Sequence, residues 1–235
     1  MKGIRRTLGT AFGLRRVRLV AALLLTALMA LAWITRREVS LPALAQEGAV
    51  VVRDVTGLRQ ALARAAPGTR VLVAPGEYAG GFSAENVRGT AETPVVVAAQ
   101  DPGNPPVFRG GRGVQLSDVA HLELRDLVFD GATANGLNID DGGSFETPSH
   151  HVRLARLTVR NVGPQGNRDG IKLSGVDDFR VEECVVERWG DGGSGVDMVG
   201  CHRGVIERCR FLHGDTSTAN AIQAKGGTRD VRVLR

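Results

Sequence analysis

One short pattern occurs five times in the C-terminal half of the chain. Each copy opens on a small residue, alternates polar and apolar residues, turns, and alternates again. The copies open at Gly113, Gly136, Gly170, Gly195 and Ala221, which are 23, 34, 25 and 26 residues apart. A self-similar period of roughly 20–50 residues is typical of solenoids and arrays. Because no copy has a run long enough for a helix, each predicts one coil with two short strands.

The alternation assigns side chains to the two faces of each strand. Residues expected to point inward from the first strands are Val114/Leu116, Leu137/Ile139, Ile171/Leu173, Val196/Met198 and Ile222/Ala224. Those expected inward from the second strands are Leu122/Leu124, Val152/Leu154, Phe179/Val181 and Gly204/Ile206. Residues expected to point outward from the first strands are Gln115, Asn138, Lys172, Asp197 and Gln223. Coils stacked ~4.8 Å apart would then form apolar ladders inside and a polar sheet surface outside.

A helix and further strands are predicted before the repeats. The segment TGLRQALARAA (56–66) places Leu58, Ala61, Leu62 and Ala65 on one helical face, with Thr56 as the N-cap. Such a helix would cover the open N-terminal edge of a solenoid. The stretches RVLVAPGEY (70–78) and TPVVVAAQDPGNPPVFRGG (93–111) follow it. Residues 46–112 are therefore predicted to be the N-terminal cap and first coils, and residues 113–235 the repeat coils.

This order of elements resembles the right-handed parallel β-helix of the pectate-lyase-like superfamily. It is most similar, in its N-terminal half, to the chondroitinase B and alginate lyase family of polysaccharide lyases. The resemblance covers about residues 50–235 and implies an all-β solenoid with a short N-terminal capping helix. The sequence stops at VRVLR, inside a predicted strand. Because solenoids need capped ends, we expect the C-terminal cap to lie outside this sequence.

The first 45 residues have the pattern of an export signal. Residues 1–18 are basic, Leu19–Ile34 is an apolar run, and Ala43–Ala45 forms an A-x-A cleavage pattern. An uncleaved membrane anchor is the alternative, although this run is shorter than the ~20 residues of a typical membrane span. We expect the mature part to be secreted, periplasmic or at the cell surface, with membrane contact only through this segment.

The basic charge of the chain belongs to this leader. The formal charge is +5 overall, of which residues 1–45 carry +7 and residues 46–235 carry −2. The predicted mature part therefore lacks the basic footprint of a nucleic-acid-binding protein. Its length suits one domain, which we expect to be a monomer. Cys184 and Cys209 fall in one inward column, as buried thiols or as a disulfide pair, and Cys201 lies at a turn.

Lysine is rare in this chain, and its placement suggests chemistry. The only lysines are Lys2, Lys172 and Lys225, and the last two fall on the same predicted sheet. A lysine can release its proton to act as a base far more readily than an arginine can. The resembled lyases remove the proton beside a uronate carboxylate and eliminate across the glycosidic bond, so both lysines are candidate catalytic residues.

The two candidate lysines differ in their expected neighbours. Lys172 is predicted beside Asp197, an arrangement typical of a structural ion pair, and a carboxylate there stabilises the charged ammonium. Lys225 is predicted beside Val199 and is the better candidate for a base on this argument.

A groove for an acidic polysaccharide is expected along the outward face of the same sheet. Its predicted walls are the two excursions of the 34-residue coil, residues 142–150 and 161–169. The predicted substrate-binding residues are Asn138, Arg168, Asn220 and Gln223. The resemblance also implies that Ca²⁺ or cationic side chains neutralise the substrate carboxylate. The predicted calcium ligands are Asp140, Asp141, Asp169 and Asp197.

Other activities of this fold remain open. The NRDG stretch at 167–170 is similar to a polygalacturonase motif, but the elements that accompany that motif are absent from the sequence, as are the signatures of classical pectate lyases and mannuronan epimerases. The main prediction is a lyase that acts on acidic polysaccharide. The alternatives are a non-catalytic carbohydrate-binding or adhesion β-helix, and a hydrolase or epimerase. A hydrolase would need two carboxylates ~5–10 Å apart.

Overall fold

The computed structural model describes residues 48–163, 165–214 and 219–235. The predicted export signal (1–45) and its cleavage site after Ala45 lie outside these residues. In the described part of the chain, no helix is long and apolar enough to cross a membrane.

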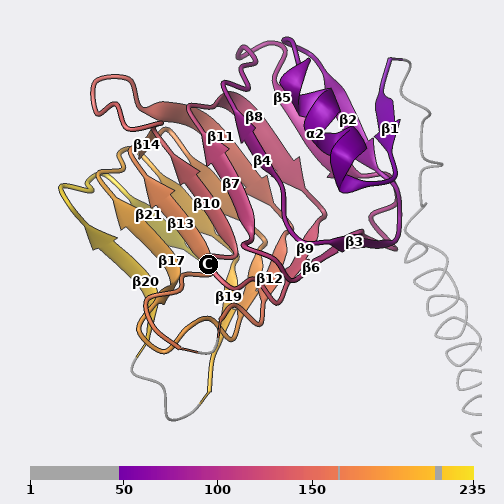
Figure 1. Ribbon diagram of the computed structural model, residues 1–235. Helices are drawn as coiled ribbons and strands as arrows, with labels where there is room; N and C mark the ends of the chain where they lie inside the picture. Colours follow the sequence, from indigo (N-terminus) through magenta and orange to yellow (C-terminus); the bar gives the residue numbers. More distant parts are fainter. Residues whose placement is uncertain (1–47, 164, 215–218) are drawn as a thin grey trace, which may run out of the picture. The chain divides into compact units, whose positions relative to one another are not determined.

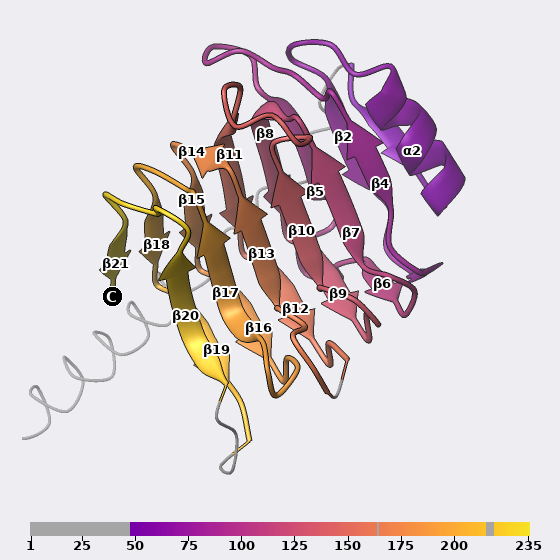
Figure 2. The same ribbon diagram turned by 60° about the vertical axis from the view of Figure 1, so that its left-hand side comes forward.

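The described residues form a parallel β-solenoid whose strands lie in three sheets (Figures 1 and 2). Sheet A contains β1 (Val50–Val52), β2 (Arg70–Val73), β5 (Val95–Ala99), β8 (Ala120–Arg125), β11 (Ser149–Ala155), β14 (Val176–Asp177), β15 (Arg180–Glu182), β18 (Val205–Glu207) and β21 (Arg232–Leu234). Sheet B contains β3 (Glu77–Ala79), β6 (Val107–Arg109), β9 (Val128–Asp130), β12 (Thr158–Arg160), β16 (Val185–Glu187) and β19 (Arg210–Leu212). Sheet C contains β4 (Ser83–Glu85), β7 (Val114–Ser117), β10 (Leu137–Asp140), β13 (Ile171–Ser174), β17 (Ser194–Val199) and β20 (Asn220–Lys225). The all-β solenoid predicted from the repeats is confirmed.

Most repeat coils have three main strands, where the repeat pattern predicted two. A corner residue with left-handed backbone follows β8, β11, β15 and β18 of sheet A and turns the chain into sheet B. These residues are Asp126, Arg156, Glu183 and Arg208, with φ between 50° and 60°. A single-residue corner bends the backbone sharply without a glycine or proline to mark it in the sequence. The apolar alternation therefore continues through the corner, and two strands look like one.

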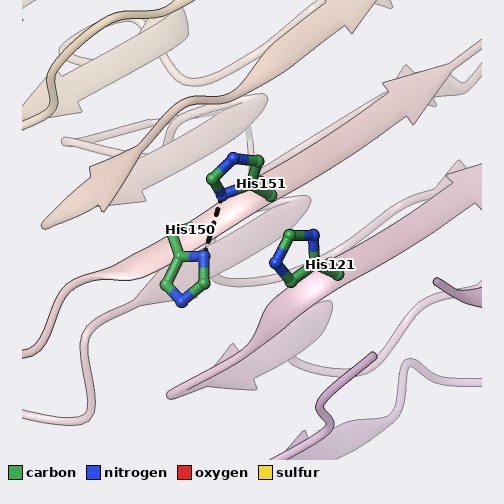
Figure 3. Close-up of side chains that lie close together, drawn as sticks. All are labelled: His121, His150 and His151. Atoms are coloured by element: carbon green, nitrogen blue, oxygen red, sulfur yellow. Dashed lines mark hydrogen bonds between the residues drawn. The ribbon is translucent and has the colours of Figure 1, made fainter. Parts of the chain in front are cut away.

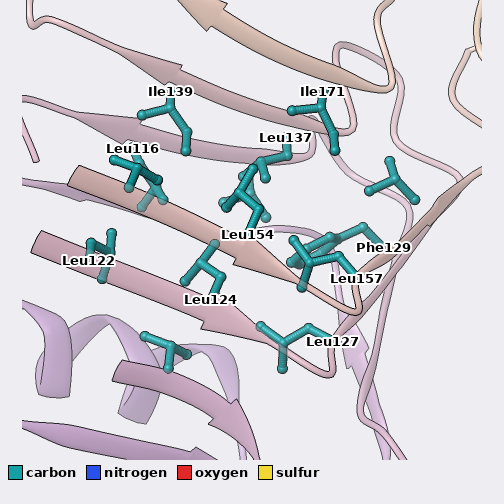
Figure 4. Close-up of a cluster of buried hydrophobic side chains, with 14 of the residues drawn as sticks. Leu116, Leu122, Leu124, Leu127, Phe129, Leu137, Ile139, Leu154, Leu157 and Ile171 are labelled. Carbon is teal, nitrogen blue, oxygen red and sulfur yellow. The ribbon is translucent and has the colours of Figure 1, made fainter. Parts of the chain in front are cut away.

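Apolar ladders fill the solenoid, as the alternation predicts (Figure 4). In sheet C, Leu116, Ile139, Leu173 and Met198 stand in register across successive coils and are all buried. The two predicted inward residues of β20, Ile222 and Ala224, keep this register but are not buried. A neighbour on only one side leaves them open to solvent.

Sheet B adds a ladder of aromatic rings. The ring centroids of Tyr78 and Phe108 are 5.0 Å apart, and those of Phe108 and Phe129 are 5.5 Å apart. At the predicted inward position 204, a glycine is required for steric reasons, because a Cβ there would lie 2.0 Å from the Phe179 ring.

Helix α2 (Val55–Ala63) packs on the N-terminal end of the solenoid, beside β1, β2 and β4 (Figure 1). Leu58 and Leu62 are buried, so the predicted helical face is confirmed. The prediction of Thr56 as N-cap is wrong. Asp54 caps the helix instead, because its Oδ1 accepts a hydrogen bond from Gly57 N at 2.7 Å.

The three cysteines are free thiols. Cys184 and Cys209 occupy equivalent corner positions in consecutive coils, directly before paired residues of β16 and β19. They stack as the predicted ladder of thiols and are not joined by the alternative disulfide. Cys201 is buried.

Candidate active site on sheet C

Two columns of outward side chains cross sheet C. The first column is Ser83, Gln115, Asn138, Lys172, Asp197 and Gln223. The second column is Glu85, Ser117, Asp140, Ser174, Val199 and Lys225. The predicted register is therefore correct, with Lys172 beside Asp197 and Lys225 beside Val199.

Asp197 is the centre of the site, and it contacts both lysines. Lys172 Nζ contacts Asp197 Oδ2, and Lys225 Nζ lies 3.1 Å from the same oxygen. The expectation that Lys225 has no acidic neighbour is wrong, because its long side chain reaches diagonally to the first column. The outward Asp197 is also not solvent-exposed, since its side chain is 0% exposed.

Asp169 supplies a second carboxylate on the other side of Lys172. Its Oδ2 lies 3.8 Å from Lys172 Nζ, and its Oδ1 accepts a hydrogen bond from Ser194 N at 2.8 Å. Burial raises the pKa of Asp169, against the opposing effect of the Ser194 hydrogen bond. This carboxyl group is therefore a weaker counter-charge than an exposed aspartate would be.

The two lysines differ in access to solvent. The Lys225 side chain is 40% exposed, whereas that of Lys172 is 16% exposed and lies between two carboxylates. Gln223 Oε1 lies 3.3 Å from Lys225 Nζ and 3.3 Å from Ser194 Oγ. Asp197 Oδ1 is buried and accepts no hydrogen bond from any described residue. Lys225 is therefore the cation best placed to meet a ligand.

The other predicted substrate-binding residues border this centre, and Asn138 pairs with Lys172 across β10 and β13. Asn138 Nδ2 donates to Gln115 Oε1 at 2.9 Å and to Asp140 Oδ2 at 3.1 Å, so its amide is part of a hydrogen-bonded row. Arg168 is exposed and directly precedes Asp169, and Asn220 is exposed in β20 beside Ser194. Only Gln223 of the predicted set contacts the lysines directly.

A depression of about 550 Å³ opens at the ends of β7 and β10. It is lined by Glu85, Asn86, Ser117, Asp118, Asp140, Asp141, Gly142, Gly143, Ser144 and Thr147. The first predicted excursion thus forms one wall of a hollow next to the sheet. The second excursion packs against the loop before β17 through Gly190 N, which donates to Arg168 O at 3.0 Å.

The four aspartates predicted as calcium ligands separate into two pairs. Asp140 and Asp141 line the depression, whereas Asp169 and Asp197 surround Lys172. Oδ2 of Asp140 already accepts two amide hydrogen bonds. Two ammonium groups beside Asp197 oppose a further cation. In this arrangement the four residues do not form one Ca²⁺ site.

A histidine cluster lies outside the predicted site (Figure 3). None of its three residues, His121, His150 and His151, is among the site residues predicted from the sequence. In the structure, one potential ligand atom from each of the three histidines lies within 4.8 Å of the other two. Among the described residues, this is the group of His, Cys, Asp and Glu side chains close enough to hold a metal ion together. The predicted alignment of Leu122 with Val152 was the available signal, because it places His121 next to His151.

Comparison with known proteins shows similarity at the level of fold. No protein-family model and no curated protein matches the chain. An alginate lyase from Paenibacillus sp. str. FPU-7 superposes with a TM-score of 0.65 at 21% sequence identity, over 79% of this chain and 64% of that one. A mannuronic acid specific family 6 polysaccharide lyase from human gut microbiota gives a TM-score of 0.52 at 17% identity, over 74% of this chain and 51% of that one.

These similarities establish that the chain has the β-solenoid fold seen in polysaccharide lyases. The chain spans less than two thirds of the length of either enzyme. Because the same fold supports several chemistries, the activity has to be argued from the residues on sheet C.

Proposed function

We propose that this protein is a polysaccharide lyase, of the chondroitinase B and alginate lyase type, that cleaves uronate-containing glycans by β-elimination on sheet C. One observation carries the proposal: Lys172 and Lys225 converge on a single, fully buried carboxylate, that of Asp197. They are the only lysines after residue 2. The similarity in fold to two lyases supports the same conclusion.

The shared carboxylate allows one lysine to act as a base. If Lys225 releases its proton, Lys172 still compensates the buried charge of Asp197, so no unpaired carboxylate is left behind. The more exposed Lys225 would then take the proton from C5 of the uronate. The electron pair of the C5–H bond forms the C4=C5 double bond as the C4–O glycosidic bond breaks, and the leaving oxygen takes up a proton from solvent water.

Sheet C also suits an anionic ligand. Arg168, Asn138, Asn220 and Gln223 are the residues proposed to bind the chain of sugars, and Arg168 is the exposed cation among them. Calcium is a proposed additional partner of the substrate carboxylate, not a requirement of the site as it stands. We also propose that the protein is exported, acts as a monomer, and takes an acidic polysaccharide, not nucleic acid, as its partner.

The test is product analysis with the full-length chain. It would be incubated with alginate, pectate and chondroitin, with and without Ca²⁺, while the ultraviolet absorbance of C4=C5 unsaturated uronides is followed. Lys225→Ala should abolish the signal and leave the circular dichroism spectrum unchanged. Unsaturated product that Lys225→Ala forms at the wild-type rate would contradict the assignment of the base.

The alternative functions give different products. New reducing ends without unsaturation would indicate a hydrolase, and altered uronate configuration without cleavage would indicate an epimerase. Retention of polymer without any chemical change would indicate a carbohydrate-binding or adhesion module. Each of these outcomes would replace the lyase proposal.

A further inference from the structure

Three histidines from two neighbouring coils meet where β8 and β11 begin (Figure 3). His150 Nδ1 and His151 Nδ1 are 2.9 Å apart, and the rings of His121 and His151 stack with centroids 4.4 Å apart. The backbone holds this arrangement, because Ala120 pairs directly with His150 in sheet A. The cluster therefore results from coil stacking and does not depend on a loop conformation.

We propose that His121, His150 and His151 form a binding site for a divalent first-row transition-metal ion, with Zn²⁺ as the expected occupant. Imidazole nitrogens are common ligands of such ions. Tetrahedral Zn²⁺ with Zn–N bonds of ~2.0–2.1 Å needs its ligand nitrogens about 3.4 Å apart. The ligand atoms here are 2.9 Å apart for one pair and all within 4.8 Å. Small rotations of the rings would separate the stacked pair and bring the three nitrogens to the distances that Zn²⁺ needs.

His121 and His151 occupy equivalent corner positions in successive coils, and this column of corner residues supports a role for a cation. His121 and His151 have left-handed backbones, with φ of 48° and 53°. The equivalent corners of the next two coils are Asp178 and Arg203, which form an ion pair with Arg203 Nε 2.8 Å from Asp178 Oδ1. At the histidine corner, by contrast, the rings of His121 and His151 stack, and the ring of His150 packs against both. Such a group is unfavourable when protonated and favourable around a metal ion.

The protonation state of the rings suits metal binding. Burial, followed by the neighbouring histidines, lowers the pKa of His121. Burial and then His151 likewise lower the pKa of His150. Both shifts favour the neutral form of the ring, which is the form that binds a metal.

The surroundings leave one coordination position to solvent. The nearby carboxylate of Asp177 already accepts from His202 Nδ1 at 2.8 Å and from an Arg203 nitrogen at 3.0 Å. His151 is exposed, so an ion can enter from solution. Three protein nitrogens and one water molecule would complete a tetrahedron.

A bound ion would join two coils beside the wall of the depression. Ser149, which directly precedes His150, donates its hydroxyl to Asp140 O at 2.7 Å and accepts from Val119 N at 2.9 Å. The metal would therefore hold the end of the excursion where it returns to sheet A. Because the ion binds only the folded arrangement, it should stabilise the solenoid.

The experiment is a zinc titration of the full-length chain, prepared without a polyhistidine tag, by calorimetry and thermal unfolding. Zn²⁺ should raise Tm. His121→Asn and His151→Asn should each weaken binding by more than about tenfold, a loss that even the outer partners of metal ligands can cause. Asparagine is chosen because it tolerates a left-handed backbone. His202→Asn is the matched control, because His202 lies two coils further along the column of His150, and it should keep the wild-type affinity.

Cobalt distinguishes the histidines from the three cysteines. Co²⁺ bound at this site should show visible ligand-field bands without a thiolate charge-transfer band. The proposal is overturned if the wild-type chain does not bind Zn²⁺, if both asparagine variants bind it as the wild type does, or if the cobalt spectrum shows thiolate ligation. None of these outcomes bears on the lyase proposal, which is tested by its products.

Discussion

Sheet A and sheet C each place one carboxylate between two cations, but the cations differ. On sheet A, Glu182 lies between Arg153 and Arg180, whose nearest guanidinium nitrogens contact its two oxygens. Both arginine side chains are 45% exposed. On sheet C, the carboxylate of Asp197 is fully buried, much as that of Glu182 is at 7% exposed, but its two partners are lysines.

Under the proposed function, this difference separates a structural surface from a reactive one. Arginine stays charged under all ordinary conditions and binds carboxylates with a planar fork, so the ladder on sheet A keeps a constant charge. Lysine can release its proton, and on sheet C one lysine is enough to compensate the carboxylate. The same geometric arrangement therefore braces the coils on one face and, on the other, allows the charge to change.

The largest expected effect comes from exchanging the two cation types. Lys225→Arg keeps the positive charge but removes the base, so turnover should fall by about 10²–10⁴-fold, the usual contribution of general base catalysis. Arg180→Lys on sheet A should leave turnover unchanged. Initial rates of unsaturated-uronide formation measure both. Equal rates for Lys225→Arg and wild type would remove the distinction between the faces.

The second effect concerns the two shared carboxylates. Asp197→Ala leaves Lys172 poorly solvated and without its main counter-charge, and should lower the free energy of unfolding by about 3–5 kcal/mol. Glu182→Ala leaves two exposed arginines that water can solvate, and should cost about 1 kcal/mol or less. Urea unfolding at neutral pH measures both changes. A larger loss for Glu182→Ala would reverse the comparison.

The third effect is that two buried aspartates on different sheets, Asp169 and Asp130, give the free energy of unfolding opposite pH dependences. Burial raises the pKa of Asp169 beside sheet C above 3.8. Its contribution to stability is therefore present below that value and is lost as the pH rises through the raised pKa. Asp169→Asn should remove this loss, as unfolding curves at a series of acidic pH values would show. An unchanged pH profile in Asp169→Asn would contradict the assignment.

Asp130 on sheet B provides the matched control. Burial alone would raise its pKa, but hydrogen bonds from Asn161 and Arg160 outweigh burial and lower it. The stability that Asp130 contributes is present above the ordinary value of 3.8 and is lost as the pH falls through the lowered pKa. Asp130→Asn should therefore alter the profile on the more acidic side.

The smallest effect tests the exposed corner pairs. Arg156 donates from Nε and a terminal nitrogen to the two oxygens of Asp126, at 2.6 and 2.9 Å, and its side chain is 44% exposed. Arg156→Ala should cost under about 1 kcal/mol, and the loss should shrink at high salt. The loss caused by Lys172→Ala should persist at high salt because that pair is buried. Thermal unfolding at low and high salt would distinguish them.

The sequence by itself determined the features that depend on local alternation. Period-2 patterning places Lys172 and Lys225 on one sheet and predicts the register of Asp197 with Lys172, because neighbouring coils of similar length stack residue on residue. The same reasoning identified the buried face of α2. These features follow from which side of a strand or helix each residue occupies.

Only the tertiary structure decided the contacts that run diagonally or around corners. Lys225 reaches Asp197 because its long side chain spans two columns, and Asp197 is fully buried although the alternation places it on the outward face. His121 meets His150 and His151 because left-handed corners bring two coils together at a position without a glycine or proline signal. Alternation along a strand does not encode side-chain reach or the path of the backbone through a corner, and both the lysine site and the histidine site depend on them.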